Sequence, residues 1–509
     1  MSSTRRQFLT AGSAALVGLT AKGERRIAGS FVNDSFAQGH LIRNRAPIAT
    51  PWRDERVPLV IVGGGIAGLS AAWRLAKREF RDFVLLEMER EAGGNARSGE
   101  NEVSAYPWAA HYVPVPGPQA VWVRELFEDL GVLANGVWNE RYLCFSPQER
   151  LFFHGKWQEG IEPALGLTRR DREQFQKLEE TFAEHRNRGG FTIPMELGRD
   201  RGPQELDRIS FADWLRALGI DSQPVTWYMN YCCRDDYGAL AADTSAWAGV
   251  HYFASRAAEE KGPLTWPGGN GWITRRLLER LGQFVRTGQM VRQIERQGNR
   301  YHVWTGDVRY TAEAVIFAAP TFLAPYVIDG FPALGRFEYS PWLTANLTIE
   351  RPPRGASTEE RAWDNVVVHS PTLGYVDATH QTLRTHVDQT VWTFYWALVE
   401  GSPVANRRLL LEKDWGYWSE AILHDLERVH PDIRSCVSRI DVMRLGHAMV
   451  RPTPGSIFDA RRLELARDQG RLVFANSDLS ALSLFEEAQY RGVTAVDRIL
   501  ALISGKRIR

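Results

Sequence analysis

A glycine-rich turn near the N-terminus has the residue types and spacing that bind phosphate groups. Gly63, Gly65 and Gly68 follow the apolar residues 59–62 and precede residues 69–78, whose apolar side chains have helical spacing. Between a strand and a helix, the first glycine permits a tight turn, the second lets the backbone approach a pyrophosphate, and the third lets the helix pack closely on the strand. Because the amides of the helix N-terminus then face the phosphates, the pattern predicts a Rossmann-type dinucleotide-binding unit.

An acidic residue ends the second predicted strand of this unit. Residues 83–86 are apolar, and Glu87 follows them at the position where a carboxylate accepts hydrogen bonds from the ribose hydroxyls of FAD or NAD. A carboxylate there would repel the 2′-phosphate of NADP. The residues therefore predict FAD or NAD as the cofactor.

The residues after this strand separate FAD from NAD. Residues 91–99 read EAGGNARSG, which resembles the second glycine motif of the flavin amine oxidase superfamily, a group that includes monoamine oxidases, protoporphyrinogen oxidases and carotenoid desaturases. The resemblance implies FAD, with Gly93 and Gly94 beside its diphosphate. Asn95 stands where the family usually has arginine, and Arg97 is the candidate to supply the positive charge instead.

Three later segments extend the resemblance along the chain. Residues 106–112 are similar to a family stretch near the isoalloxazine ring. Residues 291–320 resemble the β-ribbon and return strand that close the FAD domain, and residues 471–478, followed by a helix over about 486–503, resemble the closing motif. In that motif the helix N-terminus stabilises negative charge on the reduced flavin. The resemblance therefore implies that four separated segments converge on one cofactor.

The motif and the resemblance together give the predicted contacts to FAD. These are Gly63, Gly65, Ile66, Ala67, Gly68, Glu87, Gly93, Gly94, Asn95, Arg97, Ala110, His111, Val291, Ala318, Ala319, Pro320, Asp478, Glu487 and Ala488. Besides Asn95, three residues depart from the pattern, because Ala109, Asn476 and Glu487 stand where the family has glycine.

Other comparisons with the family distinguish this chain from a plain monoamine oxidase. Residues 343–349 contain no lysine, whereas the family's oxidases often hold a water near the flavin N5 with one. His447 stands where animal monoamine oxidases carry the cysteine that attaches the flavin. No two-tyrosine amine cage is evident, because the corresponding residues are Ala448 and either Leu484 or Phe485.

Two histidines are the candidate catalytic residues. His447 either bonds covalently to the flavin 8α-methyl group, donates protons beside the ring, or is a hydrogen-bonded core residue. His111 lies in the segment near the isoalloxazine ring and is either a group beside the flavin or a core residue. The acidic cluster at residues 234–237 is predicted to be a salt-bridge network that ends a helix, with a part in the substrate site as the alternative.

We therefore predict an FAD-dependent oxidoreductase that transfers a hydride from a substrate C–H bond to flavin N5. The substrate is a small molecule, with an amine as one candidate, and O₂ or a respiratory electron acceptor reoxidises the flavin. A desaturase or isomerase of a hydrophobic substrate is the first alternative, because the lysine and the amine cage are missing. The second is an exported flavoprotein that serves as a binding or assembly partner with little catalysis.

The predicted strands and helices that position these residues indicate an α/β protein. The Rossmann-type FAD-binding domain is discontinuous and is built from residues 55–115, 265–335 and 465–509, and an α+β substrate domain from residues 116–264 and 336–464 is interleaved with it. Helical spacing in the first insert predicts a helical lid. Period-two alternation in the second insert predicts a sheet over the flavin.

The first residues have the features of an export signal. Arg5 and Arg6 precede Phe8, and a short stretch rich in Ala, Gly and Leu covers residues 11–21. This order predicts a twin-arginine signal that the export machinery recognises on the folded, cofactor-loaded protein, and hence a periplasmic location. A basic tail with a chance arginine pair is the alternative.

The predicted leader spans residues 1–37, and a linker covers residues 38–54. Residues 35–37 have the small-x-small pattern of a cleavage site, and an earlier cut near Ala21 is the alternative.

Composition narrows the class of partner. The 62 Lys and Arg residues balance 61 Asp and Glu residues, so no overall field selects nucleic acid or an anionic membrane. No uninterrupted apolar stretch approaches the length of about 18 residues that spans a bilayer, so we predict no permanent membrane span. The four cysteines lack metal-ligand spacing, so no metal site is predicted.

Overall fold

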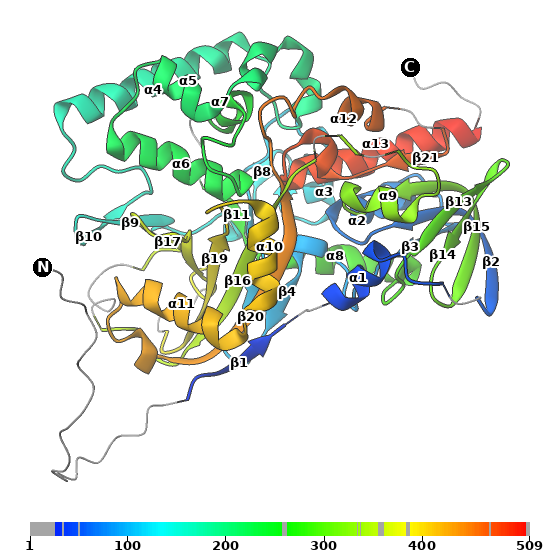
Figure 1. Cartoon of the computed structure of the whole chain (residues 1–509), viewed down its shortest axis with the longest axis horizontal. Coiled ribbons are helices and arrows are strands. Elements are labelled where there is room, and N and C mark those ends of the chain that lie inside the picture. The colour runs from blue at the N-terminus through cyan, green and yellow to red at the C-terminus, as the bar shows by residue number, and fades with distance from the viewer. Residues whose placement is uncertain are drawn as a thin grey trace, which may run out of the picture.

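The structure, a computed structural model, describes residues 26–32, 35–48, 51–256, 262–332, 334–335, 337–354, 361–382, 387–467 and 470–504. The arginine pair and the apolar stretch of the predicted export signal lie outside these residues. The described chain forms two large sheets and a group of helices that covers one end of them (Figure 1). The fold is α/β, as the sequence predicts.

The seven-stranded sheet carries the glycine-rich turn. Its strand order is β12-β3-β2-β15-β14-β13, and β21 pairs with the C-terminal part of β15. Strands β12, β3, β2, β15 and β21 are parallel, whereas β13 and β14 form an antiparallel ribbon. The strands are β2 Arg53–Val62, β3 Phe83–Leu86, β12 Val285–Arg286, β13 Gln293–Gln297, β14 Arg300–Trp304, β15 Val308–Phe317 and β21 Leu472–Phe474.

Alternate residues of β2 enter cores on the two faces of this sheet, because successive side chains of a strand point to opposite faces. Leu59 and Ile61 pack with one set of helices, and Val60 and Val62 pack with the ribbon and a short helix on the other face. A Cβ on Gly492 would lie 2.2 Å from the oxygen of Ala67, so the last helix packs directly on the start of α2. These helices are α2 Ile66–Lys77, α3 Val121–Asp129, α8 Gly271–Leu281, α9 Ala324–Val327 and α13 Phe485–Ser504.

The eight-stranded sheet has the order β1-β20-β16-β19-β18-β17-β9-β10. Its neighbours are antiparallel except for the pairs β1–β20 and β17–β9. One face packs against α10 Pro403–Glu412 and α11 Trp415–Glu427. The strands are β1 Ala28–Phe31, β9 Glu149–Phe153, β10 Lys156–Glu159, β16 Tyr339–Ile349, β17 Asp364–Val367, β18 Gly374–Asp377, β19 Thr390–Ala397 and β20 Val437–Val450.

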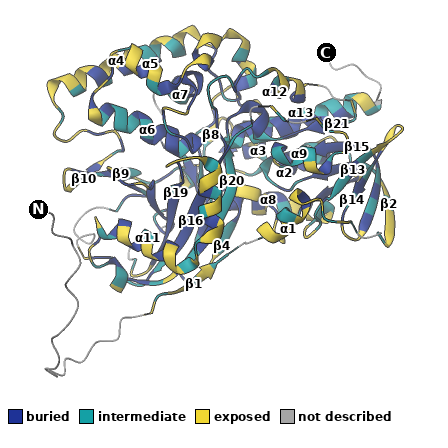
Figure 2. Ribbon diagram, viewed as in Figure 1, coloured by how far each residue is buried: buried dark blue, intermediate teal, exposed yellow. Residues whose placement is uncertain are grey.

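The predicted lid region contains four α-helices with a core of their own. They are α4 Arg169–Arg188, α5 Phe211–Ala217, α6 Gln223–Tyr237 and α7 Ala246–Ala254. The helix α4 begins with a capping box in which Thr168 and Asp171 bond each other's backbone amides. Trp247 is fully buried in their common core, and the outer side of α4 is exposed (Figure 2).

Shorter elements connect these units. They are α1 Phe36–Arg43, β4 Ser98–Glu100, β5 Ala105–Pro107, β6 Tyr112–Val113, β7 Leu133–Ala134, β8 Val137–Trp138, β11 Leu264–Thr265 and α12 Ala460–Leu465, with the 3₁₀ turns η1 Gly94–Ala96, η2 Glu140–Tyr142, η3 Met195–Leu197, η4 Arg199–Arg201, η5 Gln204–Arg208, η6 Gly282–Phe284, η7 Thr321–Leu323, η8 Ile433–Ser435 and η9 Ser477–Ser480.

Three segments differ from the predicted domain limits. The strand β1 and the helix α1 form within the predicted leader and linker. The helix α3 packs in the FAD-domain core, because its buried residues Val123, Leu126 and Phe127 join the cluster of Leu59. The hairpin β9–β10 comes from the first insert but extends the sheet of the second.

The described helices include none that is long and apolar enough to cross a membrane. A group of three or more metal-ligand side chains is likewise absent from the described part of the chain.

Candidate active site

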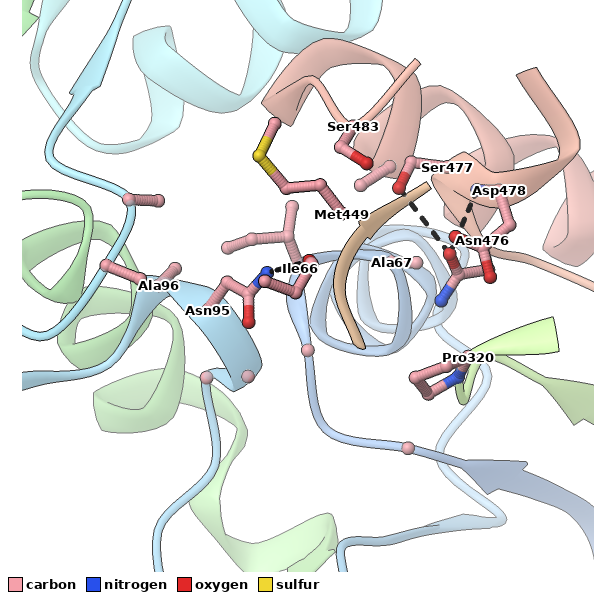
Figure 3. Close-up of a pocket in the computed structure, with 18 of the residues that line it drawn as sticks. Ile66, Ala67, Asn95, Ala96, Pro320, Met449, Asn476, Ser477, Asp478 and Ser483 are labelled. Atoms are coloured by element: carbon pink, nitrogen blue, oxygen red, sulfur yellow. Dashed lines mark hydrogen bonds between the residues drawn. The ribbon is translucent and has the colours of Figure 1, made fainter. Parts of the chain in front are cut away.

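A cavity of about 430 Å³ runs between the two sheets and beneath the helical lid. Most of the predicted FAD contacts line it, and so does His447. Three of them do not, namely Gly68, Arg97 and Glu487. Figure 3 shows Ile66 and Ala67 at the start of α2, with Asn95 and Ala96 on one side and Pro320, Asn476 and Asp478 on the other.

Two glycines of the loop have backbone atoms where a Cβ would lie, whereas a third borders open space. Gly63 has φ +105°, and a Cβ there would lie 2.7 Å from the nitrogen of Ala319; a Cβ on Gly68 would lie 1.9 Å from the oxygen of Gly63. Gly68 therefore serves helix packing, which explains why it does not line the cavity. Gly65 has no atom within 4 Å of a Cβ, and α2 has no side-chain N-cap. The first backbone amides of α2 can therefore donate hydrogen bonds to a pyrophosphate.

Glu87 is held in place by backbone amides. Its Oε2 accepts a hydrogen bond from the Gly64 amide at 2.7 Å, and its Oε1 accepts one from the Glu89 amide at 2.8 Å. Burial raises the pKa of this carboxyl, and the two amides oppose that rise. Each carboxylate oxygen keeps a second lone pair for a ribose hydroxyl.

Gln289 lines the same end of the cavity, although no motif in the sequence points to it. Its Oε1 is buried and has no hydrogen-bond partner among the described residues. The open phosphate cradle, the oriented Glu87 and this orphaned acceptor are the features that an adenine dinucleotide would complete.

Asn95 and Arg97 support the loop around the cavity. Asn95 Nδ2 donates to the oxygen of Ala448 at 2.7 Å and so joins the FAD domain to β20. Arg97 Nε donates to the oxygen of Gly94 at 3.0 Å, and its guanidinium faces Glu89 at 3.8 Å. Arg97 thus shapes the loop from behind instead of lining the cavity.

Asp478 and Glu487, the two acids of the closing segment, are placed differently. Asp478 lines the cavity, and its Oδ2 accepts from the Thr321 amide at 2.8 Å and from the Tyr339 hydroxyl at 2.7 Å. Glu487 is buried outside the cavity, where it accepts from the Met195 amide at 2.6 Å and from the Ser480 hydroxyl at 2.5 Å. These donors draw Glu487 toward the lid. Glu487 therefore does not line the cavity, where the resemblance had placed it as a contact to the cofactor.

The other end of the cavity is aromatic and acidic. Its lining includes Trp342 and Tyr395, together with the charged residues Asp235, Asp236 and Arg256. Among the residues that the structure describes, none donates a hydrogen bond to the Asp235 carboxylate, whereas the neighbouring Asp236 forms an ion pair of 2.7 Å with Arg256. Burial, and then the Asp236 charge, raise the pKa of Asp235 to about 7.

A protein-family model described as flavin containing amine oxidoreductase matches residues 66–500. The chain belongs to this family. Amine oxidase [flavin-containing] A of Canis lupus familiaris is 24% identical over 327 residues, which are 58% of this chain and 54% of that protein. The chain thus aligns with about half the length of this curated relative.

Solved structures share the fold of this family member. A putrescine oxidase bound to putrescine superposes with a TM-score of 0.67 at 17% identity, over 88% of this chain and 100% of that chain. A fatty acid isomerase from P. acnes that produces CLA gives a TM-score of 0.62 at 15% identity, over 87% and 98% of the two chains. The predicted α/β fold, the family of FAD-dependent oxidoreductases and the FAD cofactor are confirmed.

The two candidate histidines of this family member lie on different walls. His447 stacks on Phe322 with ring centroids 4.2 Å apart, and His111 lies 4.6 Å from Tyr395 between the aromatic residues of the acidic end. Burial lowers the pKa of each imidazole to about 4, and Arg407 contributes at His447. Both histidines are therefore neutral at pH 7 and would not repel a cation.

The cluster at residues 234–237 divides between the two predicted roles. Arg234 donates to the backbone oxygens of Ser370, Pro371 and Thr372, and Asp236 pairs with Arg256, as the salt-bridge prediction describes. All three of Asp235, Asp236 and Arg256 line the cavity, and Asp235 is the one without an ion-pair partner among the described residues. The sequence could not distinguish these neighbours, because only the packing of α6 decides which carboxylate pairs with Arg256.

Proposed function

We propose that this chain oxidises the C–H bond next to the nitrogen of a small cationic amine. The observation that carries the proposal is Asp235, an unpaired carboxylate on the wall of the cavity that holds the FAD-binding residues. A carboxylate held in a largely apolar cavity without a partner is costly unless it takes up a proton or a cation joins it. A protonated amine supplies that cation.

The aromatic walls and the acid have separate tasks. Trp342, Tyr395 and His111 present flat faces that exclude water and orient a substrate. Asp235 attracts the ammonium group and holds the proton that the amine gives up before its C–H bond reacts. FAD, when bound, accepts the hydride at N5. O₂ or a respiratory acceptor is the proposed final oxidant.

A panel of amines tests this proposal through peroxide release and flavin bleaching. We expect at least one small mono- or diamine to reduce the flavin. Silence toward every amine, with turnover of a polyene, a porphyrinogen or a fatty acid, would show that the substrate class is wrong.

A desaturase or isomerase of a hydrophobic substrate is the second candidate. Residues that would favour it are Leu445, Met449, Leu484 and Phe485, which give one cavity wall an apolar character. The fatty acid isomerase with the same fold fits this candidate only weakly. An assembly partner with little catalysis is the third, and any reductant that turns over and bleaches the flavin would dismiss it.

Export to the periplasm by the twin-arginine machinery is also proposed. Its support is the order of the arginine pair, Phe8 and the short apolar stretch. A reporter protein fused to this segment tests the proposal. We expect the reporter to be exported, and its export to be lost when Arg5 and Arg6 are replaced by lysine.

A further inference from the structure

The segment that contains β1 and α1 contacts both domains and covers one end of the cofactor cavity. In Figure 1 it appears in blue, with β1 at the edge of the sheet that contains β20 and α1 in front of the FAD domain. It falls where the sequence predicts a leader and a linker. Its contacts, however, are those of a structural element.

The first anchor of the segment is β1. Residues Ala28 to Phe31 pair in parallel with Arg439 to Val442 of β20. Gly29 has φ +148°, and a Cβ there would lie 1.9 Å from the oxygen of Ile440, so the strand fits because this residue is glycine. The Arg444 guanidinium lies 3.7 Å from the centre of the Phe31 ring. β1 is thus an integral edge strand of the substrate sheet.

The second anchor lies on the ribose side of the cavity. Ser35 Oγ donates to Glu89 Oε2 at 2.5 Å. The amide of the same Glu89 donates to Glu87, the predicted ribose ligand. The start of α1 is therefore connected to Glu87 through a single intervening residue, Glu89.

The third anchor lies at the adenine side. The helix α1 packs against α9, and Arg292 Nη2 donates to the oxygen of Ala46 at 2.6 Å. Ile42 is only 6% exposed, lines the cavity, and belongs to the apolar cluster of Val291 and Val327. Leu41, its neighbour on α1, points outward and is 42% exposed.

We propose that α1 is a wall of the adenosine pocket, and that β1 holds it there. FAD leaves this pocket only after α1 has moved off Val291 and α9. Proteolytic processing of the chain must therefore spare residues 28–46, and the predicted cleavage at residues 35–37 would remove the anchor on the sheet. A cut near Ala21 would leave it intact.

The first test compares Ile42→Ala with Leu41→Ala. Both remove the same apolar bulk from one helix, but only the first removes it from the cavity wall. We expect the FAD release rate, followed by the rise of flavin fluorescence after dilution, to increase about tenfold in Ile42→Ala and to stay unchanged in Leu41→Ala. If wild-type flavin remains with acid-precipitated protein, the same pair is made in a His447→Ala background.

Equal release rates in the two variants would overturn the proposal. Since no substrate is used, this failure is distinct from failure of the proposed amine oxidation. The second test is the N-terminal mass of the exported protein. We expect a mature N-terminus before Ala28, and a mature chain that begins after Ala37 yet keeps its FAD would also overturn the proposal.

Discussion

At the residue scale, Asp235 is the side chain on which substrate recognition depends. Arg256 and Arg234 lower the pKa of Asp235 but do not pair with it, because Arg256 is paired with Asp236 and Arg234 is turned toward backbone oxygens. Glu149 adds a further negative charge from β9. The acidic end of the cavity therefore favours a cationic ligand over a neutral or anionic one.

The variant Asp235→Asn tests that preference. It keeps the shape of the side chain and removes the charge, so we expect kcat/KM for an amine to fall about 10- to 100-fold, the range for a lost hydrogen bond to a charged group. Bound FAD and thermal stability should be retained. The control is Asp82→Asn, an exposed carboxylate outside the cavity. Equal kinetics in both variants would remove Asp235 from the substrate site.

The raised pKa of Asp235 also predicts a pH dependence. The carboxyl is protonated well below pH 7 and charged well above it, while an alkyl amine with a pKa near 10 stays protonated throughout. We expect kcat/KM to rise as the pH increases from about 6 to about 8, and Asp235→Asn to lose this rise. Since the pKa values of His111 and His447 are about 4, neither histidine would produce such a limb.

At the element scale, the strand–turn–helix unit of β2 and α2 separates packing from binding. Gly68 is closed by the oxygen of Gly63, whereas Gly65 borders open space. The same residue type therefore serves the fold at one position and the cofactor at the other.

Two substitutions in this unit should have opposite consequences. Gly65→Val places its side chain where a phosphate would lie, so we expect loss of FAD with a change of only about 1 kcal/mol in the unfolding free energy of the apoprotein. Gly68→Ala drives a Cβ into backbone, and we expect about 3 kcal/mol of destabilisation. FAD content and urea unfolding measure the two effects, and full FAD retention by Gly65→Val would contradict the Rossmann interpretation.

At the scale of the whole molecule, the contiguous patterns were predictable and the convergent ones were not. The glycine turn and Glu87 lie within 25 residues of one another, so their spacing alone indicates a dinucleotide site. Asp235 reaches the cavity only through the packing of α6. A strand of four residues such as β1 is too short to show a recognisable alternation in the sequence. Its pairing with β20 becomes visible only in the structure.

Glu487 illustrates the same limit within a recognised motif. Its place in the sequence implied a cofactor contact, but the Met195 amide from the lid and the Ser480 hydroxyl bind its carboxylate instead. Sequence alignment locates the backbone of such a residue. Only the surrounding donors determine where its side chain turns.

We propose that this chain binds a cationic amine at the acidic end of the FAD cavity and removes a hydride from it after Asp235 has taken the proton of the amine. The most direct measurement is the absorbance of the oxidised flavin after anaerobic mixing with amines at pH 8. We expect an amine to bleach the flavin in the wild type, and to bleach it much more slowly in Asp235→Asn at the same FAD content. If no amine bleaches the flavin, but a neutral apolar substrate reduces it or is turned over, then the chain does not oxidise amines.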